Sequence, residues 1–292
     1  MFLLPFHRHE KHLSIDVLDL NNNGRSEIFV TSVINGGRTM NSFALEYEAV
    51  TGYGRVWDRA PYFLRVLDDN LLMQKFSSFG IFTGPVFKAG WEDGNYKPED
   101  PLKLPDGVNI YGFAYINRDH KGDAELVSFD DDGYLNVYYN GETVWRSTDT
   151  YGKFEVSLKR KKGPMLDMTD DLEESSAVRD LREVFIRGRL ASVKTGRGEE
   201  VIVVKRVPIL KNMPGLGAGK TEIYSLLWTG GVMDEELLVE GISGPATDYQ
   251  IIGNELFFIV RTNMASFIKE AVGGDFLRGS RLYYYTFGRY ED

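Results

Sequence analysis

The stretch that decides the fold is residues 15–30, which read Ile15-Asp-Val-Leu-Asp19-Leu-Asn21-Asn-Asn23-Gly24-Arg-Ser-Glu27-Ile-Phe-Val30. Two runs rich in β-branched and other apolar residues flank a loop that carries Asp or Asn at alternate positions, which predicts a strand, an acidic-amide loop and a second strand. Gly24 permits the tight turn, and Glu27 opens the second strand. A unit this short indicates a fold only if it recurs.

The unit recurs along the chain. Residues 112–127 repeat the flanking strands and part of the loop, residues 189–203 keep the strands and the Glu, and residues 248–260 shorten the loop to a turn. A blade-sized segment without such a loop, residues 62–105, lies between the first two copies. A repeated antiparallel unit of this kind predicts a propeller, in which each repeat forms one small sheet.

The composition agrees with many short strands and tight turns, since 13% of the residues are aromatic and 31 are Gly. The predicted strands are residues 13–20, 27–34, 42–47, 62–67, 71–76, 86–91, 110–116, 124–129, 134–139, 184–193, 200–207, 222–228, 236–240, 249–252, 256–261 and 281–287. Two segments predict short helical insertions, residues 175–182 after a capping-box spacing and residues 264–272 after Asn263.

We therefore predict an all-β fold, a single β-propeller domain spanning residues 1–292. Its blades, about five with four strands each, are predicted at residues 10–60, 61–105, 107–153, 184–244 and 245–292. The last range supplies about three strands, so residues 2–6 are predicted to close the ring as its missing outer strand. The alternative is an incomplete arc cut from a larger propeller.

Charge and composition exclude several classes of function. The formal net charge of -9 disfavours nucleic acid as a partner, because phosphate binding needs a surplus of Lys and Arg. The absence of Cys excludes disulfides and thiolate metal sites. No apolar run approaches the roughly 20 residues that cross a bilayer, and residues 1–6 do not read as a signal peptide. We expect a monomer without a membrane span.

The pattern Asp19-x-Asn21-x-Asn23-Gly24-x-x-Glu27-Ile resembles the FG-GAP/VCBS repeat, and with its further copies the resemblance covers most of the chain. Residues 84–86 and 107–114 are similar to inter-blade segments of bacterial proteins of this type. The resemblance implies an integrin-like propeller outside the cytoplasm, whether periplasmic, outer-membrane-associated or secreted. It also implies loops that often hold Ca²⁺ and a role in binding or scaffolding.

The chemistry of the first loop suits a hard cation. Oxygen side chains at loop positions 1, 3, 5 and 9, with a backbone carbonyl at position 7, can surround Ca²⁺. Here these are Asp19, Asn21, Asn23, Glu27 and the carbonyl oxygen of Arg25. The alternative is that the two Asn side chains only satisfy the backbone of the turn.

The second loop is a weaker candidate for the same ion. It keeps Asn117, Asp119 and Glu125, but Lys121 stands where a ligand belongs, and its ammonium group can replace the ion. The third copy has Ser192, Lys194 and Gly196 at the ligand positions, so no metal is predicted there.

Other motifs have simpler interpretations. Residues 214–221 resemble a phosphate-binding loop, but Pro214 replaces the first Gly and a strand follows instead of a helix, so we predict a hairpin. Residues 130–133 are predicted to be a turn, and His7, His9 and His12 a solvated terminus.

No combination of residues predicts a catalytic site by its spacing. We therefore expect a non-catalytic binding or scaffold module with an unidentified protein or glycan ligand. One alternative is a five-bladed glycoside hydrolase with paired carboxylates drawn from Asp16, Asp68 and Asp248. The other is a purely structural domain of a larger protein.

Overall fold

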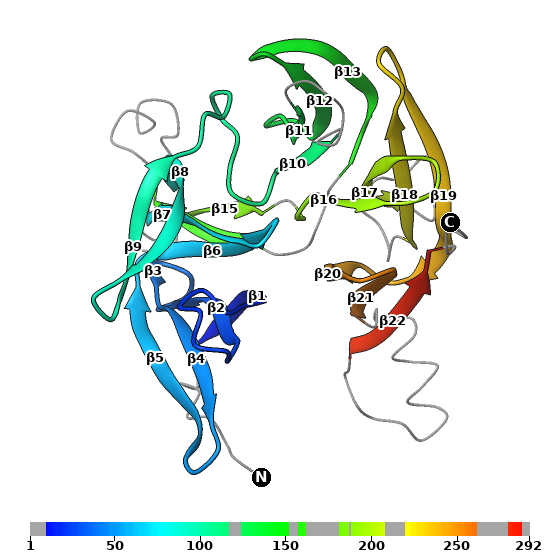
Figure 1. The fold of residues 1–292 in the computed structure, drawn as a ribbon. Coiled ribbons are helices and arrows are strands. Elements are labelled where there is room, and N and C mark those ends of the chain that lie inside the picture. The colour runs from blue at the N-terminus through cyan, green and yellow to red at the C-terminus, as the bar shows by residue number, and fades with distance from the viewer. Residues whose placement is uncertain are drawn as a thin grey trace, which may run out of the picture. The chain divides into compact units, whose positions relative to one another are not determined.

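The computed structural model describes residues 10–116, 124–151, 157–161, 181–186, 188–207, 220–261 and 280–287. Every regular element in these residues is a β-strand, and the main sheets are built from strands that follow one another in the chain (Figure 1). The chain divides into two compact units, Met1–Leu104 with Ser157–Phe185 and Pro105–Val156 with Ile186–Asp292.

The first unit contains two larger antiparallel sheets and one small one. The first sheet has the order β1 (Lys11–Leu18), β2 (Glu27–Ile34), β4 (Ser42–Glu48) and β5 (Gly52–Ala60), and β3 (Thr39–Met40) also pairs with β2. The second has the order β6 (Tyr62–Leu67), β7 (Asn70–Ser77), β8 (Ile81–Glu92) and β9 (Asn95–Pro101). The small sheet pairs β14 (Ser157–Lys161) with β15 (Leu181–Phe185).

The two larger sheets of this unit pack face to face. Their alternating apolar side chains form one core, made of Phe29, Ala44, Leu64, Leu71, Met73, Ala89 and Tyr96. At the inner strands, Thr31 Oγ1 donates to the Leu64 carbonyl at 3.1 Å and accepts the Leu64 N–H at 3.0 Å. Because this hydroxyl satisfies both backbone groups of Leu64, β2 and β6 are held in one register.

The second unit contains three sheets, again in chain order. They are β10 (Phe113–Ile116), β11 (Glu125–Phe129), β12 (Tyr134–Tyr139) and β13 (Glu142–Thr150), then β16 (Ala191–Lys194), β17 (Glu199–Val207), β18 (Lys220–Trp228) and β19 (Met233–Ser243). The third comprises β20 (Ala246–Ile252), β21 (Glu255–Arg261) and β22 (Ser280–Thr286).

The middle sheet of this unit is buried on both faces, which explains the uninterrupted apolar run in β17. Val201 and Val203 join the core shared with the β10–β13 sheet, whereas Ile202 and Val204 join the core shared with the β20–β22 sheet. Successive residues of a strand point to opposite faces, so a strand between two sheets must be apolar throughout.

Small antiparallel sheets of consecutive strands, packed face to face within each unit, are the blades of a β-propeller. The five larger sheets in the described residues confirm the predicted all-β fold and have the arrangement of a five-bladed propeller. The single domain of residues 1–292 and its closure by residues 2–6 stay predictions, and residues 2–6 lie outside the described residues.

Two details differ from the sequence prediction. Leu181 and Arg182 begin β15 instead of ending a helix, while the rest of both predicted helical insertions lies outside the described residues. The predicted strand at residues 184–193 is two strands, β15 and β16, which belong to different sheets. The apolar run continues across the break because Ile186 and Leu190 are buried there without forming a strand.

Candidate functional site

The β1–β2 loop of the first unit is closed by its own side chains. The Asp19 carboxylate accepts the N–H groups of Asn23 at 3.1 Å and Gly24 at 2.9 Å. Asn21 Oδ1 also accepts the Asn23 N–H, at 3.0 Å, and Asn23 Oδ1 accepts the Arg25 N–H at 2.8 Å. These bonds between side chains and nearby backbone are those that Asp and Asn favour in turns. The structure therefore brings the first three predicted ligands together.

Glu27, the predicted fourth side-chain ligand, has a different set of partners. Its side chain is fully buried, Oε2 accepts the Leu20 N–H at 2.9 Å, and Oε1 accepts the Tyr96 hydroxyl at 3.0 Å. Burial and the nearby Glu27 charge raise the pKa of Tyr96 well above its ordinary value, so the phenol remains a donor at neutral pH. Glu27 thus links β2 to β9 of the next sheet.

Glu46 on β4 is a member of this site that the sequence did not indicate. It lies directly across from Glu27 in the β2–β4 pair. Its Oε2 accepts the side-chain amides of Asn21 at 3.2 Å and Asn23 at 2.8 Å, and its Oε1 lies 3.5 Å from Arg25 Nη1. Only the strand register could have revealed it, because 19 residues separate Glu27 from Glu46.

The donor set of this loop fits Ca²⁺ in part. Asp19, Asn21 and Asn23 offer oxygen atoms on one short loop, but Glu27 is held by two hydrogen bonds away from them. Calcium takes six to eight oxygen ligands, so these residues alone would hold an ion weakly. In the described part of the chain, no three His, Asp or Glu side chains gather as metal ligands. Calcium binding stays a prediction.

The second copy of the repeat is described only in its strands. Asn117 and Asp119 lie outside the described residues, whereas Glu125 opens β11. Glu125 Oε1 accepts the indole N–H of Trp228 at 3.2 Å, from β18 of the next sheet. Glu125, like Glu27, thus accepts a hydrogen bond from an aromatic side chain of the next sheet.

The third copy, at the β16–β17 turn, carries a positive side chain of its own, Arg197. The carboxylate of Glu200, which is buried, accepts two bonds from Arg197, Nε at 2.9 Å and Nη2 at 3.1 Å, and further bonds from the hydroxyls of Thr195 and Ser225. Burial alone would raise the pKa of Glu200, but these bonds outweigh it and lower that pKa. Arg197 Nη1 also lies 2.9 Å from Glu236 on β19.

The predicted turn at residues 130–133 is confirmed. Asp130 Oδ1 accepts the N–H groups of Asp132, Gly133 and Tyr134 at 2.9–3.0 Å, and Oδ2 pairs with Arg146 Nη2 at 2.7 Å. Burial opposes ionisation of Asp130, but the bonds from Arg146 and the backbone lower its pKa. This carboxylate has a structural role in joining β11 to β12.

The three carboxylates of the glycoside hydrolase alternative occupy different settings. In the first unit, Asp16 is buried on β1 and Asp68 lies in the exposed turn after β6, with a left-handed φ of 51°. In the second unit, Asp248 forms a two-bond ion pair with the buried Arg189, at 3.1 and 3.2 Å. This pair joins β20 to the segment before β16.

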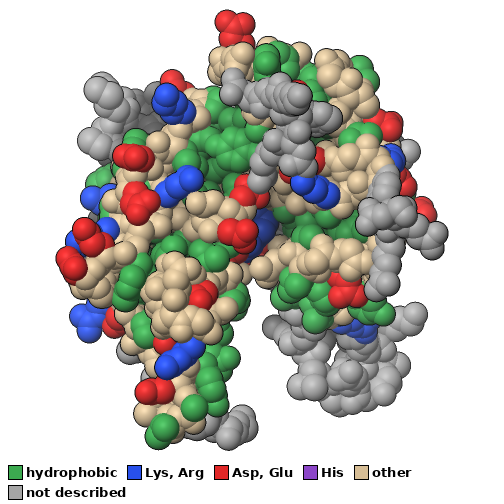
Figure 2. All heavy atoms as spheres, viewed as in Figure 1, with side chains coloured by type: hydrophobic (Ala, Val, Ile, Leu, Met, Phe, Trp, Pro, Cys, Tyr) green, Lys and Arg blue, Asp and Glu red, His purple; other side chains and the backbone are tan. Residues whose placement is uncertain are grey.

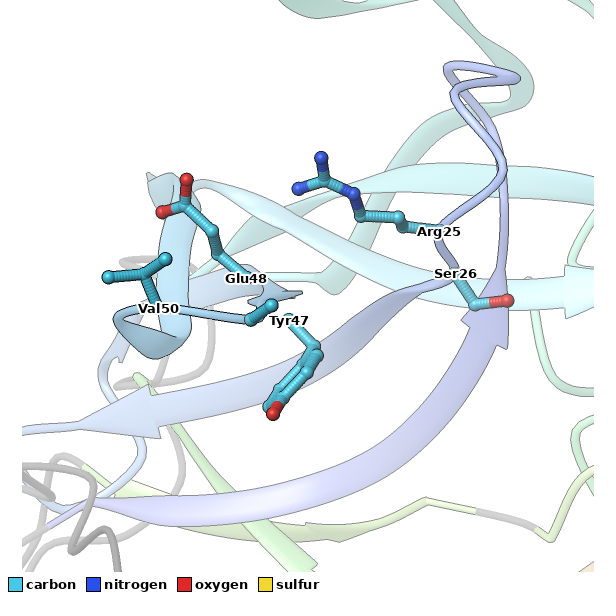
Figure 3. A pocket seen from close by; sticks show the side chains of 6 residues that line it. Arg25, Ser26, Tyr47, Glu48 and Val50 are labelled. Atoms are coloured by element: carbon cyan, nitrogen blue, oxygen red, sulfur yellow. The ribbon is translucent and has the colours of Figure 1, made fainter.

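A shallow surface pocket of about 490 Å³ lies beside the β1–β2 loop. Figure 3 shows the Arg25 side chain extending from the loop toward the end of the β4–β5 hairpin. The lining residues are Arg25, Ser26, Tyr47, Glu48, Ala49 and Val50. The Tyr47 ring meets the Tyr53 ring edge to face at 5.2 Å across the hairpin. Val50 at the tip is 89% exposed. We call this region the hairpin surface, comprising the pocket lining and Tyr53.

The hairpin surface combines exposed aromatic side chains with charged groups. Figure 2, viewed as in Figure 1, shows hydrophobic side chains on the projecting β4–β5 hairpin with charged groups beside them. Tyr47 and Tyr53 are 50% and 45% exposed although they lie in a hydrogen-bonded strand pair. Sequence reasoning missed the hairpin surface, because exposed and buried aromatic residues look alike in a strand pattern.

No protein-family model and no curated protein matches the sequence. The relation to FG-GAP/VCBS repeats therefore stays a prediction that rests on the repeated loops. Within the described segments, no helix has the length and apolar character that crossing a membrane requires.

Proposed function

We propose that the protein is a non-catalytic propeller that binds a protein or glycan ligand, or serves as a scaffold, through the hairpin surface. The observation that carries this proposal is the exposure of Tyr47, Tyr53 and Val50 beside a pocket that also presents Arg25 and Glu48. Aromatic side chains with one apolar face and a polar tip are favoured at recognition surfaces, whether for protein or for sugar rings.

The repeated carboxylates support the non-catalytic part of the proposal. Glu27, Glu125 and Glu200 each accept hydrogen bonds that join strands or sheets, and Asp248 pairs with Arg189. These carboxylates are used for packing, which favours a structural role over acid–base catalysis for them.

The resemblance to bacterial FG-GAP/VCBS proteins supports a location outside the cytoplasm and a weak Ca²⁺ site in the β1–β2 loop. Asp19, Asn21, Asn23 and the carbonyl oxygen of Arg25 would hold the ion, and Glu46 stands next to the two amides. A bound ion would fix the loop that forms one wall of the pocket.

Two measurements test the proposal on the full chain. A glycan array, together with pull-downs from envelope and secreted fractions, should yield a ligand whose binding falls at least tenfold in the double variant Tyr47→Ser/Tyr53→Ser. The matched control, Tyr139→Ser, changes an exposed Tyr on β12 of another sheet and should leave binding unchanged. Turnover of aryl glycosides that Asp16→Asn or Asp248→Asn abolishes would overturn the non-catalytic proposal in favour of a glycoside hydrolase.

A further inference from the structure

We infer that the outer edge of β5, between Gly52 and Val56, docks an extended basic segment of a partner protein as an additional strand. The inference rests on the proposed binding function and specifies the partner and the mode of contact. It depends on four features of the first unit: a free edge, the absence of protective residues, an open glycine and an aromatic pair next to a carboxylate.

The β5 strand ends its sheet. In the order β1-β2-β4-β5 it pairs with β4, and no other described strand pairs with it. One row of its backbone N–H and C=O groups therefore faces away from the sheet. Such a row is a template for a further strand, and extended peptides bind in this way to exposed sheet edges.

Two other outer strands, β9 and β19, carry residues that block such pairing, whereas β22 has no proline and Arg281 as its single charge. The β9 strand contains Pro98 and Pro101 with charged residues between them, and β19 contains the acidic run Asp234-Glu235-Glu236. Proline and charge at an edge are the usual protection against strand addition. Residues 52–56 of β5 have no proline, and their single charge is Arg55.

Arg55 does not protect the edge of β5 against strand addition. Its guanidinium carbon lies 4.1 Å from the centre of the Phe43 ring on β4, and it also pairs with Asp58. The side chain is thus folded over its own sheet. The half of β5 that begins at Gly52 is left with small, aromatic and aliphatic side chains.

Gly54 marks the point where another backbone can come close. It lies inside the strand, is exposed, and has no atom within 4 Å of the position a Cβ would take. Glycine weakens a strand interior, and its presence there often marks the close approach of a ligand or another chain. The space that a side chain at Gly54 would take is open, so a side chain of an added strand could occupy that face of the sheet.

The side chains beside the edge favour a basic segment, because the nearby cations Arg25 and Arg59 are themselves paired, with Glu46 and Asp58. Tyr47 and Tyr53 expose aromatic rings that attract cations, and the exposed Glu48 carboxylate lies at the end of the same strand pair. Val56, which is 41% exposed, gives an aliphatic contact farther along the edge. The net charge of -9 draws a basic partner toward the chain from a distance.

The test uses fluorescent synthetic peptides with the full-length protein. The probe is a heptapeptide that alternates Lys with Val and Thr, and the controls replace its Lys by Glu or its central residue by Pro. We expect anisotropy to report binding of the Lys peptide, at least tenfold weaker binding of both controls, and slower hydrogen exchange at the amides of residues 52–56.

Two protein variants distinguish binding at the β5 edge from attraction to the overall charge of the protein. Tyr53→Lys places a protective charge on β5 and should weaken binding at least tenfold. Leu237→Lys makes the same change at an exposed position of β19 and should leave binding unchanged. Circular dichroism of both variants shows whether they remain folded, and the exchange pattern of the wild-type protein tests the site without any substitution.

The remaining outcomes overturn the inference. Equal binding of the Pro-containing peptide, equal effects of both variants, or no binding of the Lys peptide would each do so. A wild-type dimer that Tyr53→Lys dissociates would show a second copy on the edge instead of a basic partner. In these cases a ligand lost in Tyr47→Ser/Tyr53→Ser would still support the proposed function, whereas glycoside turnover would refute that function separately.

Discussion

The β1–β2 loop of the first unit and the β16–β17 turn of the second are copies of one repeat, yet they satisfy the same buried carboxylate differently. Glu27 is 0% exposed and Glu200 is 2% exposed, and each lies at the start of the second strand of its blade. Glu27 accepts a backbone N–H and a phenol from the next sheet. Glu200 accepts a guanidinium from its own turn and two hydroxyl groups.

The difference shows which part of the repeat is structurally required. A buried carboxylate is costly unless donors compensate it, but the source of the donors is free to vary. The Glu is therefore kept in both copies while the loop around it changes. In the third copy Arg197 supplies the positive charge from within the chain, at the place where the first copy keeps amide and carboxylate oxygens.

The largest effect is expected at the first loop. Glu27→Leu leaves the Leu20 N–H and the Tyr96 hydroxyl without their acceptor, so we expect the free energy of unfolding to fall by about 3 kcal/mol. Urea denaturation measures it, with the exposed Glu48→Leu as control, for which we expect a change within about 0.5 kcal/mol. Similar midpoints for the two variants would show that Glu27 is not a link between sheets.

The second prediction compares the loss of stability on replacing Arg197 and Arg25. Arg197→Met removes the cation from the buried Glu200, and because the guanidinium is about a third exposed we expect a discounted loss of about 2 kcal/mol. Arg25→Met should cost under about 0.5 kcal/mol, since Arg25 is more exposed and its contact with Glu46 is long. Denaturation midpoints of the two variants provide the measurement. Equal losses of stability would show that the two loops do not differ in their need for the cation.

The pH dependence of stability tests the same difference between the two loops. The folded-state pKa of Glu200 is lowered, so its stabilisation is present above the unfolded-state value of about 4.3 and is lost as the pH falls through the folded value. The gap between wild type and Arg197→Met should therefore narrow from about 2 kcal/mol at pH 7 to under about 1 kcal/mol near pH 3. A gap that is constant across this range would mean that the guanidinium acts through packing alone.

The smallest effect concerns calcium. If the first loop holds an ion weakly, millimolar Ca²⁺ should raise the melting midpoint above that in chelator by about 2 °C, and Asp19→Ser should abolish the rise. Arg197→Met should show the same rise as wild type, because Arg197 belongs to the other loop. An unchanged midpoint in the wild-type protein would remove the metal from the proposal.

Most of the strands that the sequence predicted have a buried face, although the predicted outer strands β19 and β22 are largely exposed. In the first blade, β1, β2 and β4 carry the alternating apolar residues that the core requires, and their predicted ranges lie close to those observed. The outer strands β5 and β9 were not predicted, because most of their residues are exposed and no alternation marks them. The exposed edge of β5, on which the further inference rests, was missed for this reason.

The sequence by itself determined the repeat, the all-β class and the placement of a Glu at the start of a blade's second strand, since these depend on periodicity and turn chemistry over a few residues. Only the tertiary structure decided what each Glu does. The partners of Glu27 and Glu125 are Tyr96 and Trp228, which are 69 and 103 residues away in the chain. Contacts at such separation arise from sheet packing and strand register, and no local pattern records them.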